Sequence, residues 1–138
     1  MRLVLDTDVF VAAMRSPSGA SAELVRRIRQ GRAVMLATVP LFVEYEAVAT
    51  RAEHLAAAGA TRADVLNALD VLATLVERVE THFLWRPKLR DPDDEMVLEA
   101  AANGRADAIV TFNVRDFGRA ANEFGIGILR PAEALERL

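Results

Sequence analysis

Short apolar runs that end in polar residues recur along the chain and predict buried strands. The first covers residues 3–5 and stops abruptly at Asp6-Thr7-Asp8. The later runs have the same character and lie between segments of helical spacing. The strands predicted in this way cover residues 3–5, 34–38, 80–84, 108–112 and 126–129.

The segments between these runs predict helices, because their apolar residues recur every three or four positions. The clearest stripe follows Gly59, where Thr61 and Asp64 form an approximate capping box. This stripe consists of Val65, Leu69, Leu72, Val76 and Val79 and predicts one long helix with a single buried face. The helices predicted in this way cover residues 9–14, 22–30, 40–50, 61–79, 92–103 and 119–124.

Strands that alternate with helices predict an α/β fold of three layers, α/β/α, with a central parallel sheet of four to five strands. The 138 residues suit one compact domain, so we expect residues 1–138 to fold as a single unit. Ligands of such sheets bind outside the carboxyl ends of the strands. The polar residues that follow the strands are therefore the first candidates for a functional site.

Composition narrows the chemistry of such a site. The chain has no cysteine and only two histidines, so a thiolate or His-rich metal site is excluded and a metal must be held largely by oxygen. The formal net charge of −3 argues against binding nucleic acid by bulk attraction and requires a local basic patch instead. No apolar run approaches the roughly 20 residues that span a bilayer, and no signal peptide is evident, so we expect a cytoplasmic protein without membrane contact.

Four acids should meet at the carboxyl edge of the predicted sheet. Asp6 ends the first strand, Glu44 lies in the helix after the second, Asp94 opens a later helix and Asp116 follows the 108–112 strand. Two carboxylates about 4 Å apart repel each other by ~4 kcal/mol at an effective dielectric near 20, so such a cluster takes up protons or binds a cation. Oxygen ligands favour Mg²⁺ or Mn²⁺, and hydrolysis of a phosphodiester, most naturally in RNA, is the reaction such a centre suits.

Several of these acids have competing structural explanations. Asp6 follows a buried strand directly and has no evident capping role, whereas Asp8 suits the cap of the following helix. Asp91 suits an N-cap, and Asp93 a surface acid that the helix dipole favours. A further group, Trp85, Arg86, Lys88 and Arg90, could stack on unpaired bases and grip phosphates beside Asp94, although a structural tryptophan explains Trp85 equally well.

Several segments, in order along nearly the whole chain, resemble PIN-domain proteins, and in particular the VapC-like branch described as the toxin of a toxin–antitoxin pair. These segments are Val4-Leu-Asp-Thr-Asp-Val9, Ser16-Pro-Ser-Gly19, Glu44-Tyr45, Asp91-Pro-Asp-Asp94 and Ile109-Val-Thr-Phe-Asn-Val-Arg-Asp-Phe117. The resemblance implies a PIN-like fold and an Mg²⁺- or Mn²⁺-dependent endoribonuclease. It further implies an RNA substrate, a cognate antitoxin and a homodimer.

The resemblance also assigns roles to residues. It places Asp6, Glu44, Asp94 and Asp116 in the catalytic, metal-binding set and implies that Thr111 orients Asp6 through a hydrogen bond. Asp8 and Asn113 become supporting residues. Many members of the branch have Asp where this chain has Asn113, so the fourth acid is Asp116 or is missing.

Two other functions fit parts of the sequence. A PIN-fold binding module without catalysis would follow if Asn113 spoils the site. A phosphatase of the haloacid-dehalogenase type would use Asp6-Thr7-Asp8 as its Asp-x-Asp motif, but it also needs a lysine, for which Lys88 is the sole candidate.

Overall fold

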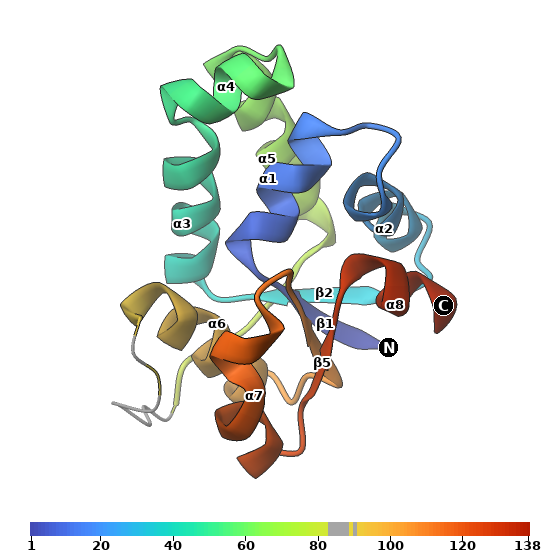
Figure 1. Ribbon diagram of the computed structural model, residues 1–138, viewed down its shortest axis with the longest axis vertical. Helices are drawn as coiled ribbons and strands as arrows, with labels where there is room; N and C mark the ends of the chain where they lie inside the picture. The colour runs from blue at the N-terminus through green and yellow to red at the C-terminus, as the bar shows by residue number, and fades with distance from the viewer. Residues whose placement is uncertain (83–88, 90) are drawn as a thin grey trace.

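The structure is a computed structural model that describes residues 1–82, 89 and 91–138 (Figure 1). Five strands and eight helices occupy these residues in the order β1 (Arg2–Leu5), α1 (Thr7–Arg15), α2 (Ala20–Arg29), β2 (Val34–Ala37), α3 (Val39–Ala49), α4 (Ala52–Ala58), α5 (Arg62–Leu75), β3 (Glu77–Arg78), α6 (Pro92–Asn103), β4 (Ala108–Val110), α7 (Val114–Glu123), β5 (Gly127–Leu129) and α8 (Pro131–Glu136).

The five strands form one sheet in the order β3-β2-β1-β4-β5, and every neighbouring pair is parallel. Strand β1 lies at the centre, where Leu3 pairs with Met35 of β2 on one side and with Ala108 of β4 on the other. Because all strands run in one direction, their carboxyl ends lie at the same edge of the sheet. The predicted parallel α/β fold is confirmed.

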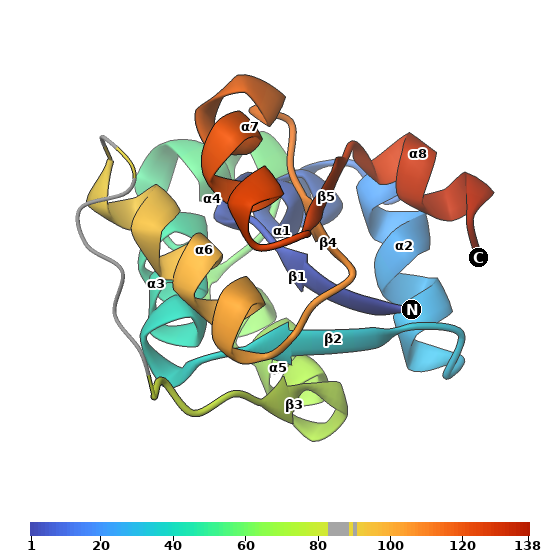
Figure 2. The same cartoon turned by 90° about the horizontal axis from the view of Figure 1, so that it is seen from below.

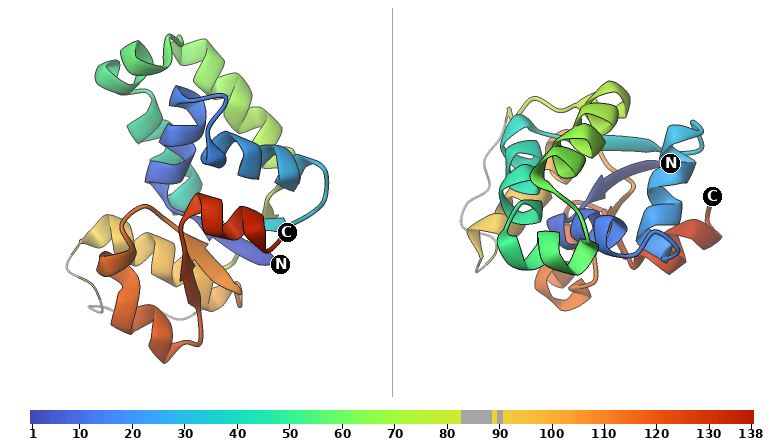
Figure 3. Two further views of the ribbon diagram at one scale, coloured as in Figure 1. Left: turned by 45° about the vertical axis from the view of Figure 1, so that its right-hand side comes forward. Right: turned by 90° about the horizontal axis from the view of Figure 1, so that it is seen from above.

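Helices cover both faces of the sheet. Helices α1 to α5 lie above the strands in Figure 1, and α6 and α7 lie below them. Figure 2, seen from below, places α6 and α7 on the near side. Helix α8 packs against α2, and the two chain termini lie near each other in both views of Figure 3. The layers are those of the predicted α/β/α arrangement.

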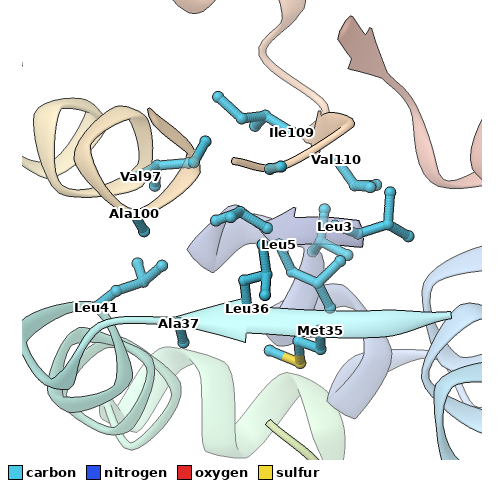
Figure 4. Close-up of a cluster of buried hydrophobic side chains, with 14 of the residues drawn as sticks. Leu3, Leu5, Met35, Leu36, Ala37, Leu41, Val97, Ala100, Ile109 and Val110 are labelled. Atoms are coloured by element: carbon cyan, nitrogen blue, oxygen red, sulfur yellow. The ribbon is translucent and has the colours of Figure 1, made fainter. Parts of the chain in front are cut away.

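The core explains why the strands are apolar throughout. Leu3 and Leu5 of β1 and Leu36 of β2 are fully buried, and they lie between the helical layers (Figure 4). Val97 and Ala100 of α6 pack on this group from the other face. Strands buried on both faces need side chains without polar alternation, which is the pattern that the sequence displays.

The predicted helix over residues 61–79 was too long. Helix α5 ends at Leu75, Val76 adopts an extended conformation, and the chain continues into β3 at Glu77–Arg78. Val76 and Val79 follow the helical spacing by coincidence, since the backbone N–H of Val79 donates to the carbonyl of Ala37 as β3 pairs with β2. The predicted 80–84 strand is therefore wrong in position, because residues 80–82 are not a strand and 83–84 lie outside the described part.

The other differences are at helices. Helix α4 was not predicted separately, because its apolar residues continue the pattern of α3. Helix α8 was not predicted either, although Pro131 is its first residue and the backbone N–H of Arg130 donates to Glu133 in a capping interaction. Helix α7 begins at Val114 rather than at residue 119, which places Asp116 in its first turn.

Candidate functional site

Asp6 follows β1 directly and is held through both carboxylate oxygens. Its Oδ1 accepts a hydrogen bond from the backbone N–H of Thr7 at 2.8 Å, and its Oδ2 accepts one from the hydroxyl of Thr111 at 2.7 Å. Asp6 is thus the N-cap of α1, which the sequence analysis did not foresee. The hydrogen bond from Thr111, which lies after β4, was predicted and is present.

Asp8 lies in the first turn of α1 and faces the same segment after β4. Its Oδ2 accepts hydrogen bonds from the backbone N–H of Phe112 and from the side-chain amide of Asn113, both at 3.1 Å. Its Oδ1 is buried and has no hydrogen-bond partner among the described residues. Asp8 is therefore not the helix cap that its sequence position suggested, and its carboxyl also interacts with that of Asp6, which affects the pKa of both acids.

Glu44 is brought to this edge by α3, and the neighbouring Tyr45 fixes that helix to β1. The Tyr45 side chain is fully buried, and its hydroxyl donates a hydrogen bond to the carbonyl of Leu5, the residue before Asp6. The ring stacks on Phe10 of α1 with centroids 5.5 Å apart. Tyr45 thereby connects the two segments that carry Asp6 and Glu44.

Asp94 and Asp116 lie in the first turns of α6 and α7. Both line a cavity of about 430 Å³ together with Asp91 and Arg115. Asp91 is the N-cap of α6, since its Oδ1 accepts from the backbone N–H of Asp93 at 2.9 Å, as its position before Pro92 predicted. Helix N-termini favour negative charge, which helps to explain the acids in both first turns.

Burial and neighbouring carboxylates raise the pKa values of two acids at this edge, Asp94 and Asp8. Burial and then the charges of Asp6, Asp91, Asp116 and Asp93 raise the pKa of Asp94 to about 7. Burial and the charge of Asp6 raise the pKa of Asp8 to about 7. Like charges act this strongly only over short distances, so carboxylates from β1, α6 and α7 share one electrostatic site.

The pKa values of two further acids of the predicted set, Asp6 and Glu44, are also raised. Burial raises the pKa of Asp6, hydrogen bonds from Thr111 and Thr7 oppose this rise, and the charge of Asp116 adds to it. Burial and then the charge of Asp93 raise the pKa of Glu44. Asp6, Asp94 and Asp116 are therefore connected electrostatically, and Glu44 is linked to this group through Asp93, which acts on both Glu44 and Asp94.

A second cavity, of about 500 Å³, lies beside these acids. Its lining includes Asp6, Asp8, Glu44 and Asp93. The sequence predicted only a surface acid at Asp93, and its position beside Asp94 gave no indication that it would line this cavity. The cavity is also lined by three residues that the sequence analysis did not single out, namely Arg15, Arg51 and His54.

Comparison of the sequence with models of protein families identifies the family of this chain. The model of the PIN domain matches residues 2–115, which include β1, α6, β4 and three of the four predicted acids, and which end one residue before Asp116. The chain belongs to the PIN-domain family. No curated protein matches the sequence in a direct search.

Solved structures show the same PIN fold. The chain is similar to VapBC2 from Rickettsia felis bound to a DNA fragment from their promoter, with a TM-score of 0.65 and 13% identity over 94% of this chain and 98% of that one. It is also similar to VapBC-1 from nontypeable Haemophilus influenzae, with a TM-score of 0.64 and 15% identity over 96% of this chain and 99% of that one. At these identities the likeness supports the fold alone.

The donor set of this PIN domain fits a divalent cation. The donors are carboxylate oxygens that repel each other, and Asp8 contributes a buried oxygen without a partner. Within the described residues, no three His, Cys, Asp or Glu side chains lie close enough to enclose an ion by themselves. Mg²⁺ retains several waters and commonly binds through one or two carboxylates, so an enclosed cluster is not required.

The predicted RNA-contacting residues lie outside the part of the chain that the structure describes. They are Trp85, Arg86, Lys88 and Arg90. Asn113 is described, and its amide donates to Asp8, so in this structure it supports an acid. Among the described helices, none is long and apolar enough to cross a membrane.

Proposed function

We propose that this PIN domain is a divalent-metal-dependent endoribonuclease and the toxin of a toxin–antitoxin pair. The observation that carries the proposal is that burial and neighbouring carboxylates raise the pKa values of Asp6, Glu44 and Asp94. Asp116 acts on both Asp6 and Asp94, and Asp93 acts on both Asp94 and Glu44. A cluster that burial and mutual repulsion drive toward protonation is suited to binding a cation at neutral pH.

In this proposal each residue has a distinct role. Asp6 and Asp94 would hold Mg²⁺ or Mn²⁺, since the charge of Asp6 raises the pKa of Asp94 more than that of any other neighbouring acid. Asp116 and Glu44 would complete the surroundings of the ion. When bound, the ion would supply polarisation of a phosphodiester and activation of water. Thr111 orients the carboxylate of Asp6, and Asn113 and Phe112 orient that of Asp8.

The biological setting is part of the proposal. The two solved structures are VapBC complexes, and by analogy we propose a cognate antitoxin as the partner of this chain. A homodimer, a single domain over residues 1–138 and a cytoplasmic location complete the proposal. The phosphatase alternative rested on a likeness of Asp6-Thr7-Asp8 to another family, and membership of the PIN family removes that basis.

Cleavage of RNA tests the proposal directly. Purified protein, freed of any partner, is incubated with labelled single-stranded RNA in Mg²⁺ or Mn²⁺, with EDTA as one control. We expect cleavage that EDTA abolishes and that Asp6→Asn reduces by at least ~10²-fold, a typical effect of losing one key group of a catalytic centre. Asp70→Asn makes the same chemical change on α5, outside both cavities, and should cleave like the wild type.

One observation favours a second candidate, a binding module that retains the PIN fold without catalysis. The position after Phe112 carries an amide, Asn113, which donates a hydrogen bond to Asp8. If the folded protein binds Mn²⁺ in calorimetry yet leaves RNA intact, the binding role replaces the nuclease.

A further inference from the structure

The cavity of about 500 Å³ extends from the acids toward a basic group that the proposed chemistry does not use. It lies between α1 and α3, which pack side by side and lead from the sheet edge to α4 (Figure 1). Asp8 and Glu44 lie in the parts of α1 and α3 nearer the sheet. Arg15 ends α1, and Arg51 precedes α4.

The two ends of this cavity are far enough apart to contact different groups of one ligand. Arg15 lies seven residues after Asp8 along α1, so at 1.5 Å per helical residue the two positions are about 10 Å apart. Arg51 follows the end of α3 as the N-cap of α4 and lines the same cavity. A strand that places one phosphate among the acids would therefore place a neighbouring one beside the arginines.

The cations at this end are available for a ligand. Arg15 and Arg51 are exposed, and neither forms an ion pair within the described part of the chain. His54 of α4 also lines this end; its buried Nδ1 has no hydrogen-bond partner among the described residues, and its Nε2 lies 3.9 Å from Oε1 of Glu53. Arg51 is also close enough to Glu44 to oppose the rise in that acid's pKa, so the basic and acidic ends adjoin.

The net negative charge of the chain means that a polyanion can bind only where arginines such as these are grouped. With a net charge of −3 and a cluster of carboxylates at the reacting edge, the protein repels a polyanion except where cations are grouped. The planar guanidinium fork fits phosphate in a bidentate manner.

We propose that Arg15 and Arg51, with His54 beside them, bind a second phosphate of the RNA strand, next to the phosphodiester that the acids act upon. The inference rests on the proposed function, since it takes RNA as the substrate. The proposal adds a phosphate-binding subsite near α4. An RNA substrate would have to extend beyond the cleaved bond as far as this subsite to gain the contact.

The first test measures RNA binding and cleavage by Arg15→Ala and Arg51→Ala. We expect each variant to raise KM by about tenfold, the usual effect of losing one charge-assisted hydrogen bond. We also expect each to lower the slope of log Kd against log salt by ~0.7, the value for one phosphate contact on a single strand. Arg137→Ala removes the same charge beside α8 and should change neither quantity. Thermal unfolding verifies that the variants remain folded.

The second test locates the contact on the RNA. Oligonucleotides that carry a single neutral methylphosphonate linkage are titrated into the uncleaving Asp6→Asn protein and into Asp6→Asn combined with Arg51→Ala. One linkage adjacent to the cleaved bond should weaken binding to the first protein about tenfold and leave binding to the second unchanged. If no linkage shows this coupling, or if both arginine variants behave like Arg137→Ala, the subsite is refuted.

The two proposals fail separately. A wild-type protein that cleaves RNA while the arginine variants match Arg137→Ala retains the nuclease and loses the subsite. A wild-type protein that does not cleave loses the nuclease, and the binding titrations with Asp6→Asn still decide whether the arginines hold a phosphate.

Discussion

At the scale of single residues, the site depends on side chains that orient other side chains. Thr111 is fully buried, donates its hydroxyl to Asp6 and accepts the backbone N–H of Asn113 at 2.9 Å through the same oxygen. One hydroxyl thus fixes both the carboxylate after β1 and the turn after β4. The sequence predicted this contact only through the family resemblance, since nothing in the spacing of residues 6 and 111 indicates it.

Replacing this hydroxyl should weaken cleavage and stability together. Thr111→Val leaves the N–H of Asn113 without its acceptor, which costs about 1–3 kcal/mol, and it frees the Asp6 carboxylate to rotate. We expect a lower unfolding temperature and a kcat at least fivefold below that of the wild type. Thr111→Ser keeps the hydroxyl and should restore kcat, and equal rates for the two variants would contradict a positioning role.

The acids themselves show which roles can be inferred from the sequence. Asp6 and Asp94 were identified because they follow a strand and open a helix, positions that a one-dimensional pattern reveals. Arg51 and His54 were not identified, because single basic residues in an alanine-rich segment are common and do not indicate a functional site. Their significance arises only when α4 packs against α1.

At the scale of elements, the connection between β1 and α3 depends on one buried hydroxyl. Tyr45→Phe keeps the ring that packs on Phe10 and Phe42 and removes the hydrogen bond to Leu5. We expect a loss of about 1 kcal/mol in the free energy of unfolding and a clear fall in kcat, because Asp6 and Glu44 are no longer tied together. Thr74→Val removes a side-chain hydrogen bond on α5, away from the site, and should affect neither cleavage nor metal affinity.

The end of α6 depends on close packing rather than on backbone freedom. Gly104 has a φ of −84°, which any residue adopts, but a Cβ there would lie 2.8 Å from Cγ2 of Val79 and 2.9 Å from the carbonyl oxygen of Ala100. Gly104→Ala should therefore destabilise the protein by about 1–3 kcal/mol. Gly118, inside α7, has open space around it, so Gly118→Ala should stabilise by about 0.5–1 kcal/mol. Denaturant unfolding of the two variants checks both signs.

Most elements could be predicted from the sequence because their apolar pattern matches their burial. The predictions fail where contacts with distant parts of the chain determine the secondary structure. Strand β3 has two exposed charged residues, Glu77 and Arg78, and is a strand only because β2 offers an unpaired edge. Glu77 is further held by Arg2, whose guanidinium reaches it at 2.5 Å from the start of β1. A contact over 75 positions leaves no local trace in the sequence.

At the scale of the whole molecule, the clustered acids make stability depend on pH. The pKa values of Asp8 and Asp94 rise from 3.8 to about 7 on folding, so the folded state binds more protons than the unfolded state between these values. Stability contributed by these groups is fully present below pH ~4 and is lost as pH rises to ~7. For the metal-free protein we expect a higher unfolding temperature at pH 5.5 than at pH 8.

Divalent metal should reverse this trend. Mn²⁺ or Mg²⁺ binds deprotonated carboxylates, so its stabilising effect should be larger at pH 8 than at pH 5.5. Differential scanning fluorimetry at the two pH values, with metal or EDTA, measures both effects. Asp94→Asn should flatten the pH dependence, and an unfolding temperature that rises steadily with pH in EDTA would contradict the coupling.

The two hydrogen bonds that hold the Asp6 carboxylate affect which substitutions the protein could tolerate at this position. Asparagine caps a helix as well as aspartate does, and the hydroxyl of Thr111 can rotate to meet an amide. The Asp6→Asn form, which the proposed function makes inactive, therefore has no structural penalty and escapes the repulsion of Asp116. Under that proposal, activity and stability oppose each other at this position, as they commonly do at active sites. A cell harmed by this protein would have a single-nucleotide route to a silent, well-folded version, since GAY and AAY codons differ only in their first base.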